Sequence, residues 1–269
     1  MQEQKELILI KLGGSVITDK TSGKEIVDKP RLNQLAEEIH VARTQTGIHI
    51  LLAHGAGSFG HPPAQRYNTI NGLTDVRSLL GMAEVREAML RLNLAVIQSL
   101  VKAGEPAITI PPVSFVTSKE KVMDKLFTDS IVNLLNFGLV PVIHGDVITD
   151  SVIGSTIFSG EQILNRLALE LQKFGYHPKM VIEVGTTDGV YNNMIDKKTI
   201  PQIDQNNFTD LVSGFGKSSG VDVTGGMAHK VEEALSLAET GIPSLLISGR
   251  KSNLEKALMG QPVRGTWIR

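Results

Sequence analysis

The octapeptide His54-Gly55-Ala56-Gly57-Ser58-Phe59-Gly60-His61 follows directly on an apolar run, Ile48–Ala53, that has the composition of a buried strand. A second glycine pair, in Lys11-Leu12-Gly13-Gly14-Ser15, follows another such run, Leu7–Ile10. Glycine lets the chain turn sharply and leaves backbone N–H groups accessible to a ligand. Consecutive N–H groups after a strand form a concavity that binds anions, more strongly where a helix begins. Two such loops, one beside Lys11 and one closed by His61, predict a site for more than one phosphate, as a phosphotransferase needs.

Short apolar runs alternate with longer helical patterns along nearly the whole chain. Buried strands are expected at six of these runs: Leu7–Ile10, Ile48–Ala53, Ala107–Ile110, Leu139–Ile143, Met180–Val184 and Ser244–Ile247. Helices are expected from Pro30, from the capping box at Ser159–Gln162, and from Val231 to a stop at Gly241. The alternation predicts an α/β fold, a three-layer sandwich whose central, mainly parallel sheet is covered by helices on both faces. Ligands of such folds bind beyond the carboxyl ends of the strands, where both glycine loops should lie.

Two segments break this alternation. Asp146–Phe158 has the pattern of a hairpin that turns at Asp150-Ser151. Asn192–Gly220 is polar, rich in glycine and serine and poor in core residues, so a mobile loop region is expected there. No linker divides the chain, which predicts a single domain over residues 1–269. The residues before and after about position 180 are expected to have different functions.

Composition excludes several classes of function. The net charge of −1 gives no reason to expect binding to nucleic acid or to a membrane surface. The absence of cysteine excludes disulfides and thiolate metal sites and fits a reducing compartment. The first six residues are polar, unlike a signal peptide, and no apolar run approaches the roughly 18–20 residues that span a bilayer. A soluble, cytoplasmic protein is therefore expected.

Two further clusters lie in the second half of the chain. Thr187-Asp188-Gly189-Val190-Tyr191 follows the run at 180–184, and Asp222–Lys230 opens a helix with a glycine pair. Lys230 lies one turn into that helix, where it can meet phosphate charge. Each cluster alone has an ordinary alternative, since Asp-Gly is a common turn and Thr-Gly-Gly a common helix entry. Four such clusters, each at a strand end, favour a ligand site.

These clusters are similar to motifs of the amino acid kinase superfamily and, within it, of the isopentenyl phosphate kinases, nearly from end to end. The matching motifs are Lys11–Ser15, Lys20, His54–His61, Gly145–Val147, Ser159-Gly160, Asp188–Tyr191 and Asp222–Met227. His61 is the most selective of them, since it is shared chiefly with isopentenyl phosphate and fosfomycin kinases. The chain departs from the pattern at Ala56, at Glu161 (usually aspartate), and at Glu183–Thr186, which is unlike the usual Thr-Asp-Val-Asp.

The resemblance implies transfer of the γ-phosphoryl group of ATP to isopentenyl phosphate, and to dimethylallyl phosphate, for isoprenoid biosynthesis. A phosphate acceptor is already ionised near neutral pH, its second pKa being about 6, so no strong general base is needed. Catalysis then depends on cations and N–H donors that neutralise charge on the transferring group. Mg²⁺ is expected to bind through substrate phosphates and waters, with no protein ligand assigned. The superfamily also implies a homodimer.

Site residues follow from the resemblance, position by position. It implies Lys11, Lys20 and His61 as catalytic residues, and acceptor contacts at Gly55, Ala56, Gly60, His61 and Gly160. It implies nucleotide contacts at Lys11, Gly13, Gly14, Ser15, Ala56, Asp188, Tyr191, Gly226 and Lys230. Residues 1–178 would form the acceptor lobe and residues 179–269 the nucleotide lobe.

Alternatives remain for the function and for single residues. A kinase of the same fold could act on a phosphonate such as fosfomycin or on an amino-acid carboxylate, although a carboxylate acceptor has little use for His61. A non-catalytic nucleotide sensor is the alternative outside the enzymes. Ordinary structural roles are open for Lys11, Lys20, His54, His61, Asp146 and Asp150, and Lys119–Lys121 is expected to be solvated. The apolar stripe Met82, Val85, Met89 and Leu92 could be core or the wall of a tail pocket.

Overall fold

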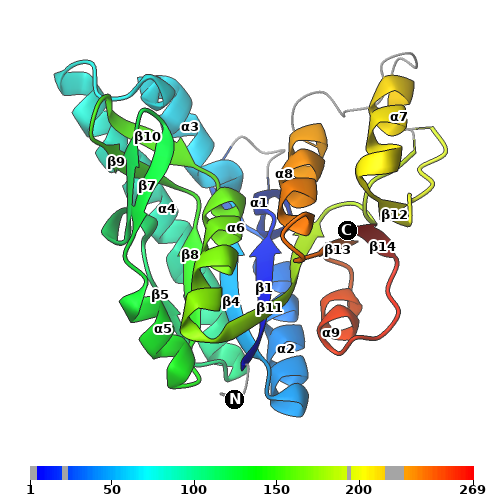
Figure 1. Cartoon of the computed structure of the whole chain (residues 1–269). Helices are drawn as coiled ribbons and strands as arrows, with labels where there is room; N and C mark the ends of the chain where they lie inside the picture. The colour runs from blue at the N-terminus through cyan, green and yellow to red at the C-terminus, as the bar shows by residue number, and fades with distance from the viewer. Residues whose placement is uncertain (1–4, 20–23, 193–194, 216–226) are drawn as a thin grey trace.

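The computed structural model describes residues 5–19, 24–192, 195–215 and 227–269 of the 269-residue chain. A sheet with the strand order β12-β14-β13-β11-β1-β4-β8-β5 runs through the centre of the molecule (Figure 1). Its strands are β1 (Lys5–Leu12), β4 (His49–His54), β5 (Ala107–Thr109), β8 (Val140–His144), β11 (Tyr176–Gly185), β12 (Gln202–Ile203), β13 (Ser244–Ser248) and β14 (Gly265–Ile268). All neighbouring pairs among these described strands are parallel except β13 with β14. The six predicted strands and the mainly parallel sheet are thus confirmed.

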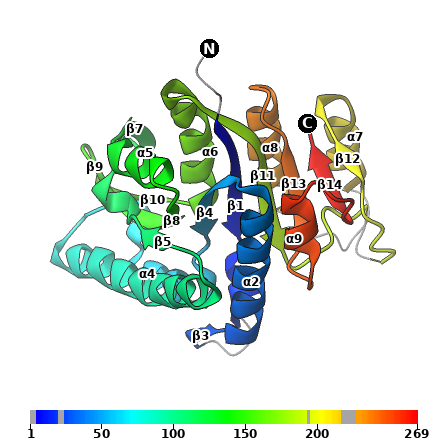
Figure 2. The same cartoon turned by 90° about the horizontal axis from the view of Figure 1, so that it is seen from below.

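Helices cover both faces of this sheet (Figure 2). One face carries α2 (Lys29–Thr46), α4 (Val76–Ala103) and α9 (Asn253–Leu258), and the other carries α5 (Asp129–Asn136), α6 (Gly160–Leu171) and α8 (Ala228–Ala238). The capping box predicted for α6 is present, because the Ser159 hydroxyl accepts from Gln162 N and the Gln162 side chain accepts from Ser159 N. In the described part of the chain, no helix is both long and apolar enough to cross a membrane.

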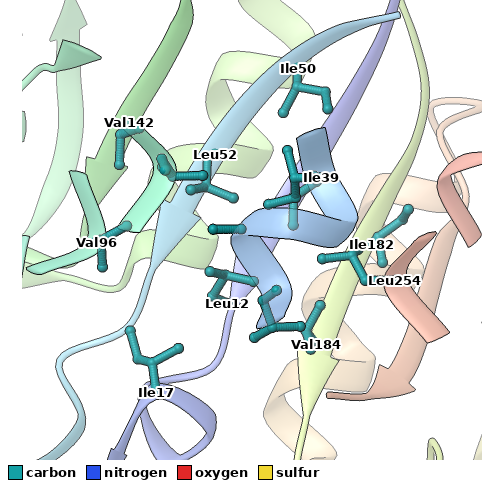
Figure 3. Packing of buried hydrophobic residues seen from close by; sticks show 14 of the residues in the cluster. Leu12, Ile17, Ile39, Ile50, Leu52, Val96, Val142, Ile182, Val184 and Leu254 are labelled. Atoms are coloured by element: carbon teal, nitrogen blue, oxygen red, sulfur yellow. The ribbon is translucent and has the colours of Figure 1, made fainter. Parts of the chain in front are cut away.

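The central strand β1 is buried on both faces, and its residues alternate between two cores. Ile8, Ile10 and Leu12 pack with α2 and α4, in the cluster of Figure 3. Leu7 and Leu9 pack with α5 and α6 on the opposite face. A strand covered on both faces has a nearly continuous apolar sequence, which is why this run was recognisable. The same alternation directs Lys11 to the face covered by α6.

Chain order reverses at β1. Of the strands in this sheet, the earlier ones, β4, β5 and β8, extend it on one side of β1, and the later ones, β11, β12, β13 and β14, extend it on the other. The loop from β1 into α1 (Gly14–Ile17) and the loop from β4 into α3 (Gly57–Tyr67) leave the carboxyl ends of neighbouring parallel strands. In open α/β sheets the ligand crevice forms at such a reversal of strand order.

A smaller sheet, in the order β10-β9-β6-β7, lies beside the carboxyl end of the large one. The predicted hairpin is confirmed as β9 (Asp146–Asp150) and β10 (Gly154–Phe158). It pairs with a second hairpin, β6 (Val116–Lys119) and β7 (Val122–Leu126), whose exposed turn is the Lys119–Lys121 run. Burial tends to raise the pKa of Asp150, but hydrogen bonds from neighbouring N–H groups and from a serine hydroxyl lower it below its usual range. Asp150 therefore shapes the junction of the two hairpins. A third, two-stranded sheet joins β2 (Thr18–Asp19) to β3 (Ile26–Val27).

The expectation of a loop region over Asn192–Gly220 is wrong for much of that segment. It contains β12 and a helix, α7 (Gln205–Phe215). The helix begins after Asp204, whose side chain accepts from the N–H groups of Asn206 and Asn207. Phe208 packs, with Leu211, against the small core formed by α8, β12 and β14. Few apolar residues suffice because the rest of this core comes from distant parts of the chain.

We predict that Glu105→Gln lowers the free energy of unfolding by about 2–3 kcal/mol. This buried carboxylate binds Arg43 Nη1 at 2.5 Å and His40 Nδ1 at 2.9 Å, joining α2 to the segment after α4. Removing one partner of a fully buried pair costs roughly 3–5 kcal/mol, and the part-exposed cations reduce that cost. Urea unfolding measures the effect, with the exposed Glu37→Gln on α2 as the control. A loss below about 0.5 kcal/mol would show that the cluster does not stabilise the fold.

Candidate functional site

A cavity of about 530 Å³ opens at the carboxyl ends of the central strands. Eleven of the fourteen predicted site residues line it: Lys11, Gly13, Gly14, Ser15, Gly55, Ala56, Gly60, His61, Gly160, Tyr191 and Lys230. Asp188 is not among the lining residues, and Lys20 and Gly226 lie outside the described residues. Segments separated by more than two hundred positions in the sequence thus meet around one space.

The two glycine loops touch each other backbone to backbone. Gly55 N donates to Leu12 O at 3.0 Å, which ties the second loop to the end of β1. A Cβ atom on Gly55 would lie 2.9 Å from Gly14 N, closer than real Cβ atoms approach a backbone nitrogen. Gly57 has φ of +54°, a conformation that favours glycine. The glycines are required because their loops pack together, and this packing forms the floor of the cavity.

Among the described residues, four helices begin at this cavity: the short α1 and the longer α3, α6 and α8. A helix N-terminus carries a partial positive charge and N–H groups without intrahelical partners. Within the described part of the chain, the N–H groups of Ala56 and Gly160 are not paired with any protein acceptor. Both residues line the cavity, so both amides can donate to an anion there.

Lys11 supplies a buried positive charge between two carboxylates. Its Nζ lies 2.5 Å from Glu161 Oε2 and 3.4 Å from Glu183 Oε2, and all three side chains are less than a tenth exposed. Burial alone would lower the pKa of Lys11, but Glu183 and Glu161 outweigh it and raise the pKa above its usual value. The lysine therefore stays an ammonium ion at every physiological pH. Glu161 Oε1 is buried without a hydrogen-bond partner among the described residues.

Glu161 and Glu183, the two partners of Lys11, are site residues that sequence reasoning missed, and Glu183 is the more distant in sequence. The register of β1 and β11 pairs it directly with Lys11, although the two residues lie 172 positions apart. Burial and the neighbouring Glu161 raise the pKa of Glu183 to about 7, and they outweigh Lys11 and Lys230, which lower it. A sequence signal existed, because a glutamate inside the otherwise apolar run 180–184 requires a charged partner.

One end of the cavity is apolar. Val85 and Met89 of α4 line it together with Ala64, Ile157 and Phe158. Of the predicted stripe on α4, Met82 and Leu92 do not reach the cavity, and Leu92 is core. His61 lies in α3, after the glycines of the loop and before Ala64 of the apolar end. It lines the cavity and is exposed.

Asp146 lines the same cavity and is paired with Arg86 of α4, whose Nη1 lies 2.5 Å from Asp146 Oδ2. Burial raises the pKa of Asp146 to about 6, against the opposing effect of Arg86 and of backbone N–H donors. The pair joins the hairpin β9–β10 to α4, and so connects two walls of the cavity.

Asp188 holds the loop rather than facing the cavity. Its carboxylate accepts from the Ser248 hydroxyl at 2.5 Å and from Arg250 Nη1 at 2.8 Å, and the residue is buried. The next residue, Gly189, has φ of +95° and turns the chain so that its neighbours Thr187, Val190 and Tyr191 line the cavity. Asp188 thus anchors the loop whose other residues form the wall.

His54 and His144 lie side by side at the carboxyl ends of β4 and β8, with ring centroids 5.4 Å apart. Burial and, after it, the neighbouring His144 lower the pKa of His54 to about 3, against one hydrogen bond to Gly55 O that raises it. Burial likewise lowers the pKa of His144 to about 4, against its bond to Gly145 O. Both rings are therefore neutral in the folded protein at neutral pH.

Comparison with known proteins accounts for this arrangement. The sequence model of the amino acid kinase family matches residues 6–248. The chain belongs to the amino acid kinase family. The isopentenyl phosphate kinase of Methanothermobacter thermautotrophicus is 35% identical over 270 residues, covering 97% of this chain and 98% of that protein. The isopentenyl phosphate kinase of Methanocaldococcus jannaschii is 34% identical with the same coverage. A solved structure, described as X-ray structures of isopentenyl phosphate kinase, has a TM-score of 0.80 and 32% identity and covers 97% of this chain and all of that one.

The buried histidines should make the protein less stable as the pH is lowered. Between the ordinary pKa of 6.5 and the folded pKa of about 4, unfolded His144 binds a proton that folded His144 does not. Stability contributed by the neutral ring is therefore complete above pH 6.5 and is lost as pH falls, by up to about 1.4 kcal/mol per pH unit. Urea unfolding of the wild type and of His144→Asn at pH 7.5, 6 and 5 measures it. The raised pKa of Asp146 gives the opposite slope, which both proteins share and which cancels in the difference. Parallel stability curves for the two proteins would contradict the prediction.

Proposed function

We propose that this member of the amino acid kinase family transfers the γ-phosphoryl group of ATP to isopentenyl phosphate, and to dimethylallyl phosphate, giving the diphosphate and ADP. One observation carries the proposal: a single cavity joins two glycine loops and a buried ammonium group to an apolar end. An isoprenyl monophosphate has this same division into an anionic head and an apolar tail. The relatives named isopentenyl phosphate kinase, which match over nearly the whole chain, support the same substrate.

The acceptor phosphate binds at the start of α3 and α6 on this proposal. Gly55, Ala56, Gly60 and Gly160 surround it, the N–H groups of Ala56 and Gly160 donate to it, and His61 donates a further hydrogen bond. Its tail extends toward the apolar residues of α4 and β10. A carboxylate acceptor such as glutamate would leave the apolar end unused, and the relatives give no support to a phosphonate kinase or a nucleotide sensor. A sensor would also have no use for both Lys11 and the glycine loop His54–His61, which meet at one cavity.

The transferring phosphoryl group lies next to Lys11 on this proposal, with Gly13, Gly14 and Ser15 leaving room for it. The transition state spreads negative charge over the equatorial oxygens, and a fixed ammonium group in a water-poor site stabilises that charge without reorganisation. Glu161 and Glu183 hold Lys11 in place and keep it charged. Lys20 is proposed as a second cation by resemblance, and it lies outside the described residues.

The nucleotide occupies the half of the cavity formed by residues 179–269. Tyr191 and Lys230 line that half, and Gly226, outside the described residues, precedes the start of α8. Asp188 holds the loop that carries Tyr191 in place through Ser248 and Arg250. Residues before 178 then serve the acceptor.

Mg²⁺ would enter with ATP, because this cation prefers phosphate and water oxygens to a cage of protein ligands. The donor set fits this arrangement. Among the described residues, no group of three or more histidine, aspartate or glutamate side chains is placed to hold a metal ion, while Glu161 Oε1 is a buried, unpartnered carboxylate oxygen at the cavity. When bound, the cation neutralises phosphate charge, and Glu161 is the residue that could contact it.

A homodimer is proposed from an apolar stripe on the outer face of α4. Val76, Leu80, Leu90, Leu94 and Val101 are all more than 40% exposed, and their spacings are close to whole numbers of helical turns. Ile108, on the neighbouring edge strand β5, is also exposed. Several exposed apolar side chains gathered on one face of a helix favour an interaction site. A second copy of the chain is the simplest occupant, since two-fold dimers are the commonest oligomers.

Lys11→Met should lower kcat by about 10²–10³-fold while the protein remains folded. The charge it removes faces the transferring phosphoryl group, and one such electrostatic interaction contributes roughly that factor. Coupled ADP release with isopentenyl phosphate measures it, and circular dichroism checks the fold. Turnover within about threefold of the wild type would show that Lys11 is only structural.

His61→Ala should lower kcat/KM for the acceptor by about 10–150-fold and leave KM for ATP nearly unchanged. A hydrogen bond to a charged group contributes roughly 1.5–3 kcal/mol, which corresponds to that range. His61→Asn retains an N–H donor and should recover part of the loss. A defect confined to ATP would remove His61 from the acceptor site.

The double variant Leu90→Glu/Leu94→Glu should convert the dimer to a monomer. Two carboxylates in the middle of an apolar interface would be buried without partners, which is strongly unfavourable. Light scattering should report about twice 29.1 kDa for the wild type and 29.1 kDa for the variant. A wild-type mass near 29.1 kDa would refute the dimer, and an unaltered dimer in the variant would move the interface elsewhere.

A further inference from the structure

His54 and His144 use the same hydrogen bond at the ends of neighbouring strands. His54 Nδ1 lies 3.1 Å from the carbonyl oxygen of Gly55, and His144 Nδ1 lies 2.9 Å from that of Gly145. A carbonyl oxygen can only accept, so each Nδ1 must carry the proton. In each case a buried ring holds the peptide bond of the glycine that follows it in the sequence.

Asn93 fixes the state of the first ring. Its side-chain Nδ2 lies 3.1 Å from His54 Nε2, and an amide N–H there requires Nε2 to be an acceptor. His54 is therefore neutral with its proton on Nδ1, which agrees with its lowered pKa of about 3. The ring is fully buried, so solvent does not compete for either nitrogen.

The orientation of the Gly55 carbonyl determines the direction of the next amide. In a trans peptide the C=O and the N–H of the following residue point in opposite directions. Because the Gly55 oxygen faces the buried His54 ring, the N–H of Ala56 faces away from that ring. Ala56 lines the cavity, and its N–H has no protein acceptor among the described residues.

We propose that His54 is a positioning residue that holds the Gly55–Ala56 peptide so that Ala56 N–H donates to the acceptor phosphate. The proposal rests on the proposed function, which puts that phosphate at this loop. His144 holds the Gly145–Asp146 peptide in the same way. The preceding peptide is also fixed, because Gly145 N donates to His54 O at 3.1 Å, and a Cβ on Gly160 would lie 2.9 Å from the same oxygen.

A role in packing alone does not account for this pair. His144 Nε2 is buried with no hydrogen-bond partner among the described residues, so the polar ring costs free energy at a position that an apolar residue could fill. What the ring provides is its Nδ1–H bond to the glycine carbonyl. The same bond, repeated at His54, points to orientation of the backbone at the floor of the site.

Two conservative variants separate the two ring nitrogens. The side-chain nitrogen of asparagine lies where Nδ1 lies, and the side-chain amide of glutamine reaches the place of Nε2, where its Oε1 can accept from Asn93 Nδ2. His54→Asn should therefore keep the bond to Gly55 O and retain kcat/KM for isopentenyl phosphate within about threefold. His54→Gln keeps the contact with Asn93 but loses the carbonyl bond, and should lower kcat/KM for the acceptor about tenfold, with KM for ATP changed less than twofold. His49→Gln, at the other end of β4, is the matched control and should behave like the wild type.

The resonance of Ala56 gives a readout that a structural role would not move. In protein labelled with ¹⁵N-alanine, inorganic phosphate should shift the Ala56 amide in the wild type and in His54→Asn, but not in His54→Gln. Equal behaviour of the two His54 variants in kinetics and in titration, or a loss confined to ATP, would overturn the proposal. Should His54→Gln not fold, His54→Asn decides alone, since loss of acceptor turnover in it would contradict the role of Nδ1. A wild type that binds phosphate at Ala56 but does not turn over isopentenyl phosphate would overturn the proposed function and leave the positioning of Ala56 supported.

Discussion

The buried ammonium group of Lys11 is the charge around which the molecule is organised. Removing an ammonium ion from water costs several kcal/mol, and the cost is offset only by close, well-placed partners. Glu161 and Glu183 are those partners, one at the start of α6 and one on β11. The ion cluster therefore joins β1, β11 and α6 at the point where the order of strands in the sheet reverses. With two carboxylates beside it, Lys11 keeps its proton and is available to an anion that enters the cavity.

The backbone around this charge is built from close contacts that only glycine permits. The loops after β1 and β4 pack directly against each other at Gly14, Gly55 and Gly57. Their contact puts unpaired amides at the floor of the cavity, beside the starts of α3 and α6. On the proposed function, phosphate recognition is mainly a property of the backbone, and a change of side chain such as Ala56 for glycine leaves the N–H in place.

Much of the fold followed from local pattern, because strands buried on both faces have short, continuous apolar sequences. The glycine loops could be predicted for a similar reason, since each follows its strand directly. Glu183 could not be paired with Lys11 from the sequence, because the pairing depends on the register of β1 with β11 across 172 positions. The helix at 205–215 was missed because its few apolar residues complete a core supplied by α8 and β14. Asp188 was assigned to the nucleotide, yet its carboxylate is occupied by Ser248 and Arg250.

The central claim is that one cavity binds an anionic head and an apolar tail together and phosphorylates the head. Incubation with ATP, Mg²⁺ and isopentenyl phosphate, followed by ³¹P NMR, tests it most directly, with fosfomycin and glutamate as parallel acceptors. The account predicts that the acceptor monophosphate resonance is replaced by the two coupled resonances of a diphosphate while ADP accumulates. Fosfomycin and glutamate should give no phosphorylated product at comparable rates. An unchanged monophosphate resonance, or faster product formation from fosfomycin or glutamate, would contradict the account.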